Sequence, residues 1–125
     1  MYKILIVDDE AKIREVLAEY AEFEGFESDQ AGDGMEAVQK CKQNDYDLIL
    51  MDIMMPVMNG LDATKAIRDL DRADAKTVPI IAMTANAFAE DVARCKEAGM
   101  NEHIAKPIDI VDMKTKIARS MRKSL

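Results

Sequence analysis

The sequence is poor in the residues that build zinc and redox sites. It contains two cysteines, Cys41 and Cys95, and a single histidine. The cysteines are far apart, and neither belongs to a CxxC pair or a Cys/His cluster, so neither a structural zinc site nor a thiol redox motif is indicated. We expect both to be reduced residues of the core.

Long hydrophobic runs are also absent. No apolar stretch approaches the roughly 20 residues that span a bilayer. The apolar stretch nearest the start, Ile4–Val7, runs directly into acidic residues, whereas a secretory leader needs a longer stretch and a small-residue cleavage site. With 49% hydrophobic and 33% charged residues, the composition predicts one globular domain over residues 1–125, placed in the cytoplasm and without a membrane partner.

An excess of positive charge is missing as well. The formal net charge of −7 repels phosphate backbones, which argues against direct nucleic-acid binding and favours metal ions or basic partners. The last segment is an exception, but its cations suit the negative end of a final helix dipole. These cations are Lys114, Lys116, Arg119, Arg122 and Lys123.

Strand-like segments recur along the chain. Three short runs, Ile4–Val7, Leu48–Met51 and Ile80–Met83, are continuously apolar, as expected of central strands buried on both faces of a parallel sheet. The runs Phe26–Ala31 and His103–Lys106 are mixed in polarity, which suits edge strands.

Helical patterns lie between these strands. Ile13–Tyr20 and Ala63–Leu70 carry apolar residues at i, i+3, i+4 and i+7, and weaker patterns cover Met35–Cys41, Phe88–Ala98 and Ile110–Met121. Five such β/α repeats predict a flavodoxin-like, doubly wound parallel sheet of order 2-1-3-4-5 with five helices, in three α/β/α layers.

Chemically active side chains follow the predicted strands at their carboxyl ends, where doubly wound sheets place functional sites. Asp8, Asp9 and Glu10 follow the first strand, Asp52 the third, Thr84 the fourth and Lys106 the fifth. Carboxylates brought this close destabilise a fold unless a cation neutralises them. Oxygen ligands without histidine or thiolate favour Mg²⁺ over zinc.

Four motifs, individually common but jointly specific, carry a resemblance to a known family. They are the acidic pair Asp8-Asp9, the segment Asp52–Gly60 with its Met-Met-Pro and final glycine, Met83–Ala85, and Lys106-Pro107. In this order and spacing, essentially the whole chain resembles the receiver domains of two-component response regulators, including the chemotaxis regulators. The resemblance implies a phosphorylation-dependent signalling switch.

The resemblance also implies roles for the acids. Asp52 would accept a phosphoryl group from a phosphohistidine. Asp8, Asp9 and Asp52 would hold Mg²⁺, or Mn²⁺ in its place, together with the backbone carbonyl of Met54.

Further residues gain roles by resemblance. Thr84, Ala85 and Lys106 would bind the phosphoryl group, and the Lys106–Pro107 bond would be cis. His103 stands where the family has an aromatic switch residue; because histidine is smaller and polar, we expect a less sharply defined switch that responds to pH.

The lifetime of the acyl phosphate and the partners follow from the same resemblance. Met54 and Asn86 occupy positions that tune attack by water. A histidine kinase or histidine phosphotransfer domain would dock on the first helix, around Arg14 and Ala18. A downstream protein would bind the face made by the fourth helix, fifth strand and fifth helix. The domain itself would be a monomer or a phosphorylation-dependent dimer.

Other interpretations stay open. Met83–Ala87 and Gly99–Asn101 look like receivers of hybrid sensor kinases, while the first half looks like receivers of transcriptional regulators, so the chain is either a stand-alone receiver or a module of a larger protein. A phosphatase of the haloacid dehalogenase type needs a second Asp two residues after its nucleophile as a general acid, and this chain has Met54 there. Without that general acid we expect a phosphoacceptor with slow self-dephosphorylation and no turnover of external substrates. A phosphate-independent interaction module is the third alternative, but it would lack one of the site residues, and none is missing.

Overall fold

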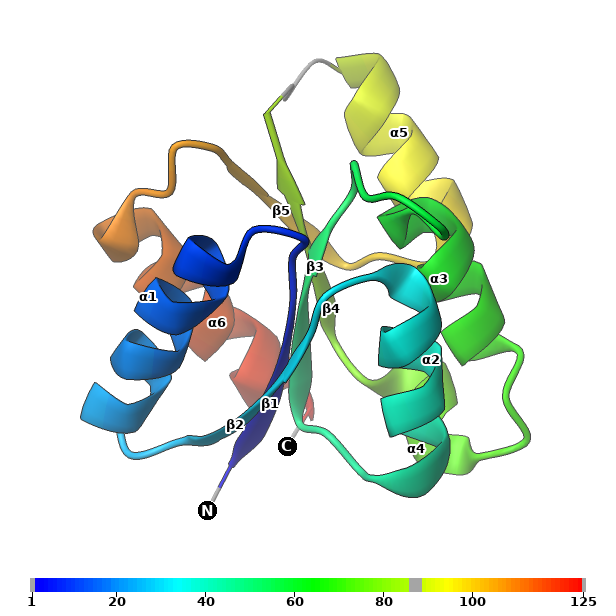
Figure 1. The fold of residues 1–125 in the computed structure, drawn as a ribbon, viewed down its shortest axis with the longest axis horizontal. Coiled ribbons are helices and arrows are strands. Elements are labelled where there is room, and N and C mark those ends of the chain that lie inside the picture. The colour runs from blue at the N-terminus through cyan, green and yellow to red at the C-terminus, as the bar shows by residue number, and fades with distance from the viewer. Residues whose placement is uncertain (1, 86–88, 125) are drawn as a thin grey trace.

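The computed structural model describes residues 2–85 and 89–124 and has a parallel sheet covered by helices on both faces (Figure 1). The strands are β1 (Lys3–Val7), β2 (Glu27–Ala31), β3 (Leu48–Asp52), β4 (Ile80–Thr84) and β5 (Glu102–Ala105). The helices in the described residues are α1 (Ala11–Phe23), α2 (Gly34–Gln43), α3 (Gly60–Arg68), α4 (Ala73–Thr77), α5 (Ala89–Ala98) and α6 (Ile110–Ser124).

The sheet confirms the predicted topology. All pairings are parallel and the strand order is β2-β1-β3-β4-β5. The three continuously apolar runs form the central strands, and the two mixed runs form the edges. Reversal of strand order between β1 and β3 places the carboxyl ends of these two strands at the switch point of the fold.

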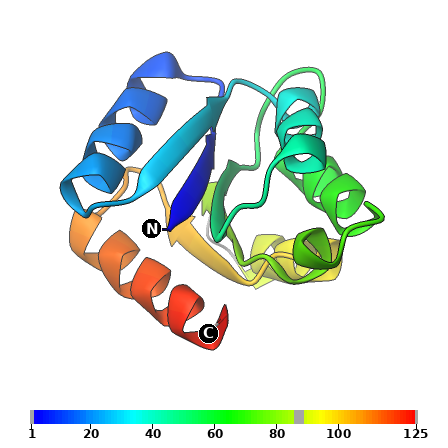
Figure 2. The ribbon, with the colours of Figure 1, turned by 90° about the horizontal axis from the view of Figure 1, so that it is seen from below.

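Two apolar cores lie on opposite faces of the sheet, because successive strand residues point to opposite sides. Ile4 and Ile6 pack with residues of α1 and α6, whereas Leu5 and Val7 pack with residues of α2, α3 and α5. The views along two directions show this division, with α1 and α6 on one side of the sheet and α2, α3, α4 and α5 on the other (Figures 1 and 2).

The predicted count of five helices was too low, since the described residues contain a sixth, short helix, α4. Arg72 at its N-cap forms ion pairs with Asp45 and Asp74, and Ala75 is 2% exposed. Arg68 of α3 donates to the carbonyl of Ala75 over 3.1 Å. A five-residue helix is too short to show a helical period in the sequence. The fourth and fifth helices of the resemblance therefore correspond to α5 and α6.

The two cysteines are buried thiols, as predicted. Cys41 in α2 and Cys95 in α5 belong to the core on the same face of the sheet. Burial raises the pKa of Cys41 to about 11, so this thiol is protonated and unreactive at neutral pH.

None of the helices in the described ranges combines the length and apolarity needed to cross a membrane.

Candidate functional site

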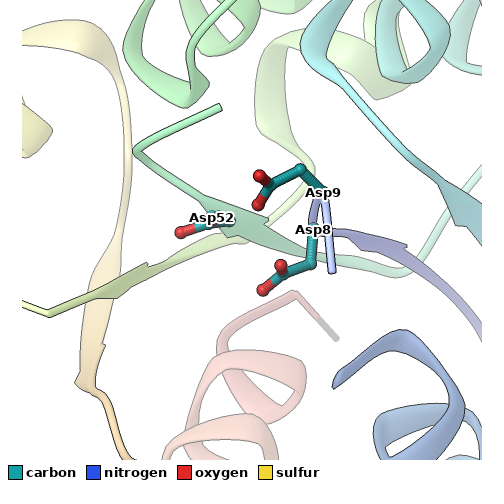
Figure 3. A group of neighbouring side chains, drawn as sticks. All are labelled: Asp8, Asp9 and Asp52. Atoms are coloured by element: carbon teal, nitrogen blue, oxygen red, sulfur yellow. The ribbon is translucent and has the colours of Figure 1, made fainter. Parts of the chain in front are cut away.

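Three carboxylates meet at the carboxyl edge of the central strands. Val7 of β1 pairs with Met51 of β3, so the residues that follow, Asp8 and Asp52, leave the sheet side by side. One carboxylate oxygen each from Asp8, Asp9 and Asp52 lies within 4.8 Å of the others. Figure 3 shows Asp8 and Asp9 at the end of β1 beside Asp52 at the end of β3. The structure thus brings together the three acids that the sequence singled out.

Two of these acids are buried and share one ammonium group. Asp8 is 0% and Asp52 4% exposed, whereas Asp9 is exposed. Lys106 Nζ lies 2.8 Å from Asp8 Oδ2 and 3.3 Å from Asp52 Oδ1. Three carboxylates against one lysine leave an excess of negative charge at a site where two of the acids are buried. Such a site favours a cation with oxygen ligands.

The electrostatics of the site show in the pKa of Asp52. Burial, reinforced by the charge of Asp8, raises the pKa of Asp52 to about 6, although Lys106 opposes the shift. Burial alone would lower the pKa of Lys106, but its hydrogen bond to Asp8 and the charge of Asp52 raise it above its ordinary value. At neutral pH Asp52 is therefore an ionised carboxylate and Lys106 a cation.

The loops that follow β3, β4 and β5 are joined by backbone hydrogen bonds. Ile53 N donates to Met83 O over 3.2 Å, and Lys106 N donates to Thr84 O over 2.8 Å. Thr84 is buried at the end of β4, and Ala85 after it is exposed. The edge of the sheet therefore holds Thr84 and Lys106 in adjacent backbone positions.

The remaining predicted site residues lie around this edge. The side chain of Met54 is 78% exposed, and it lines a hollow with Asn59, Thr84 and Ala85. The Lys106–Pro107 bond is cis, as the resemblance implies. Asn86 lies outside the described residues.

His103 occupies a different surface. It is half-buried on the edge strand β5, and its carbonyl accepts a hydrogen bond of 2.8 Å from Lys116 Nζ of α6. A hollow between α5, β5 and α6 is lined by His103 together with Val92, Lys96 and Arg119. The predicted output face thus contains a polar side chain that faces an open groove.

Two glycines hold the site, and sequence reasoning missed their physical role. A Cβ added to Gly60 would lie 2.2 Å from the carbonyl oxygen of Asp52, and one added to Gly34 would lie 2.4 Å from the carbonyl oxygen of Met58. Gly60 N also donates to Ile53 O over 2.9 Å. The first turn of α3 therefore touches the backbone of Asp52, which only a residue without a side chain permits. The glycine that ends the Asp52–Gly60 motif was the available signal.

The loop between β3 and α3 contains a strained turn. Met58 N donates to Pro56 O over 2.7 Å, and the intervening Val57 has a φ of 67°. This pattern is a γ-turn, and a positive φ is unfavourable for a β-branched residue. The strain lies in the segment that leads from Asp52 to Gly60, at the edge of the candidate site.

Comparisons with known proteins agree with this geometry. A family model described as the response regulator receiver domain matches residues 4–118. The transcriptional regulatory protein ResD of Bacillus subtilis is 37% identical over 122 residues, covering 98% of this chain and 49% of ResD. The chain thus spans about half the length of ResD, and between 6% and 17% of the histidine kinases that also match.

Solved structures show the same fold. The chemotaxis protein CheY4 of Vibrio cholerae aligns with a TM-score of 0.90 at 31% identity, covering 96% of this chain and 98% of CheY4. The receiver domain of the sensor histidine kinase PA1611 from Pseudomonas aeruginosa aligns with a TM-score of 0.86 at 35% identity, covering 96% of this chain and 97% of that domain. That structure has a magnesium ion coordinated in its active site cleft.

Proposed function

The chain belongs to the response regulator receiver domain family, and we propose that it carries a phosphoryl group on Asp52. Members of this family in two-component systems receive phosphoryl groups from histidine kinases. One observation carries the proposal. Asp52 is a buried carboxylate within reach of two further acids and of the Lys106 ammonium. A carboxylate in such a setting is a competent nucleophile toward phosphorus once the surrounding negative charge is neutralised.

Asp8, Asp9 and Asp52 would hold Mg²⁺, with the backbone carbonyl of Met54 as a further ligand. The donor set fits this ion because it consists of carboxylate oxygens gathered within 4.8 Å. The magnesium ion in the PA1611 receiver supports the same assignment. Mn²⁺ accepts the same oxygen ligands. When bound, the metal neutralises negative charge on the site and on the incoming phosphoryl oxygens.

The chain's own residues would carry the transfer. An oxygen of Asp52 forms the new bond to phosphorus as the bond from phosphorus to the donor's imidazole nitrogen breaks. The electron pair of the broken bond stays on that nitrogen, and the imidazole takes up a proton from water. Lys106, already bonded to Asp8 and close to Asp52, would pair with the phosphoryl oxygens as they approach. The Thr84 hydroxyl and the backbone at Ala85 would bind another of these oxygens. Met54 and Asn86 would then govern access of water to the product.

The donor would dock beside the site. An apolar groove between α1 and the segment leading into α6 is lined by Ile13, Val16, Pro107, Ile108 and Ile110, and the side chain of Val16 is 54% exposed. This groove adjoins Lys106, so a helical histidine kinase or phosphotransfer domain seated there would present its phosphohistidine to Asp52.

The output would pass through the α5–β5–α6 face that carries His103, toward a downstream protein. Turnover of external phosphate esters is disfavoured because Met54, two residues after Asp52, has no proton to give to a leaving group. We therefore propose a phosphoacceptor that catalyses its own phosphorylation and slow dephosphorylation, rather than a phosphatase.

The test is covalent labelling with acetyl phosphate, with and without Mg²⁺, followed by intact mass. We expect a single phosphoryl gain that requires Mg²⁺, is lost in Asp52→Asn and is retained in Asp69→Asn, a matched change at the exposed acid that follows α3 as its C-cap. A folded wild type that gains no mass would overturn the proposal, and so would labelling that persists in Asp52→Asn.

A further inference from the structure

Arg14 of α1 makes contacts that point away from a docking role and toward the acids. Its Nη1 donates to the backbone carbonyl of Asp8 over 2.7 Å, and its Nε donates to Gln30 Oε1 of β2 over 3.2 Å. We propose that Arg14 is a positioning residue for the metal site, which fixes the peptide that joins Asp8 to Asp9. The inference rests on the proposed function, because it concerns the Mg²⁺ site assigned there.

Asp8 is held at four of its polar atoms. Its backbone N–H donates to Ala31 O over 3.1 Å, and its Oδ1 accepts from Glu10 N over 2.9 Å. Its Oδ2 accepts from Lys106 Nζ over 2.8 Å. The bond from Arg14 to the carbonyl oxygen completes the set. These protein contacts fix Asp8 without help from a metal ion.

Asp9 differs from Asp8 because its side chain is exposed. The carbonyl that Arg14 binds belongs to the peptide plane between the two acids. Rotation of this plane would leave the pairing of Asp8 with β2 intact but would swing the backbone of Asp9. The guanidinium therefore controls where the exposed carboxylate points relative to its two buried neighbours.

Arg14 itself is anchored on the other side. Gln30 lies in β2, next to Ala31, whose carbonyl binds Asp8 N. A planar guanidinium with two donors in a fixed fork connects β2 to the Asp8 carbonyl in one geometry, which a flexible ammonium does not reproduce. Arg14 is also half-buried, so its guanidinium is engaged within the domain and is not a freely solvated contact for a kinase.

The experiment measures Mg²⁺ affinity directly. Because the chain has no tryptophan, binding is followed by titration calorimetry on wild type, Arg14→Gln, Gln30→Ala, the double variant and Asp9→Asn. Lys12→Gln is the matched control, since it removes an exposed cation from the first turn of the same helix. Thermal unfolding in EDTA establishes that each variant is folded.

We expect Arg14→Gln to weaken Mg²⁺ binding about tenfold, the loss typical of removing a residue that orients a metal ligand. Gln30→Ala weakens it less, and the double variant matches Arg14→Gln, because both changes remove one connection. Lys12→Gln binds as wild type does. Saturating Mg²⁺ restores the acetyl phosphate labelling rate of Arg14→Gln, which general damage to the fold would lower at every Mg²⁺ concentration.

The outcomes separate this inference from the proposed function. If wild type does not bind Mg²⁺, the metal assignment itself fails. If wild type binds, Asp9→Asn is weakened and Arg14→Gln is not, only the role of Arg14 is overturned. Equal losses in Lys12→Gln and Arg14→Gln would assign the effect to charge and also overturn it. If Arg14→Gln does not fold, Gln30→Ala decides, and an unchanged affinity rejects the inference.

Discussion

The carboxyl edge of the sheet and the α5–β5–α6 face are built differently. At the edge, Asp8 and Asp52 are buried, and Asp8 is bonded through its backbone and its side chain. On the face, the ion pairs Arg119–Glu102 and Lys116–Asp112 are partly exposed to solvent. Exposed pairs contribute little to stability, whereas buried charges are costly to disturb. The difference teaches that a change at the carboxyl edge should cost this domain more stability than a change on the α5–β5–α6 face.

The largest expected effect is at Gly60, where the edge leaves no room. In Gly60→Ala the new Cβ would meet the carbonyl oxygen of Asp52 at 2.2 Å, so the first turn of α3 must move. We expect a loss of about 3 kcal/mol in the free energy of unfolding, measured in urea. Gly32→Ala, whose Cβ would have no neighbour closer than 3.6 Å, is the control and should change little. Equal losses in both would show that the close approach is not what makes this glycine necessary.

A second prediction concerns the charge of Asp52. Its pKa is raised to about 6 by burial and by Asp8, so the protonated form favours folding. This stabilisation is present below the ordinary pKa of an aspartate and is lost as pH rises through about 6. In EDTA at about pH 8, Asp52→Asn should therefore exceed wild type in stability by up to about 3 kcal/mol.

The pH dependence provides the control for that prediction. The advantage of Asp52→Asn should shrink as pH falls through about 6, where folded wild type binds the proton. Thermal unfolding of both proteins across this range gives the difference directly. An advantage that stays constant with pH would contradict the assignment of the cost to the buried charge.

A smaller gain is expected from relieving the strained turn. Val57 has a φ of 67° and is 81% exposed, so Val57→Gly removes an unfavourable backbone conformation without loss of packing. We expect the variant to be about 0.5 kcal/mol more stable, since the relief exceeds the greater flexibility of glycine when unfolded. Val111→Gly, an exposed valine in helix α6, should be destabilised instead. Loss of stability in both variants would indicate that the turn is not strained.

The smallest effect is expected on the output face. Glu102→Gln removes the charge that pairs with Arg119 over 2.7 Å. Because the pair is partly exposed, we expect a change below about 0.5 kcal/mol that becomes smaller still in high salt. A loss above about 1 kcal/mol would show that this face is held as firmly as the carboxyl edge, and the comparison would fail.

The sequence predicted the fold well where the signal was local. The continuously apolar runs beginning at Ile4, Leu48 and Ile80 identified the central strands, because burial on both faces leaves no polar alternation. The acids at the ends of the first and third strands, and Lys106, followed from the rule that function collects at carboxyl ends. These residues do lie together in the structure.

Features that depend on contacts between helices, strands and loops were not predictable from local patterns. Helix α4 is held by Arg72, which also binds the remote carbonyl of Lys42, and by Arg68, which joins Ala75 of α4 to the remote carbonyl of Gly99. The role of Gly60 depends on the approach of Asp52, and that of Arg14 on the carbonyl of Asp8 and on Gln30 of β2. Such contacts arise only when strands and helices are assembled, and the alternation of residue types carries no trace of them.

The position of β5 in the sheet has a mechanical consequence. The acids extend from β1 and β3, each paired on both sides, but Lys106 follows an edge strand that is paired only with β4. Fewer backbone bonds resist displacement of an edge strand than of an inner one, so the cation rests on the more compliant support. His103 lies on the same strand and is linked to α6 through Lys116. A force on the Lys106 ammonium would therefore displace β5 slightly, while the acids on the inner strands keep their positions.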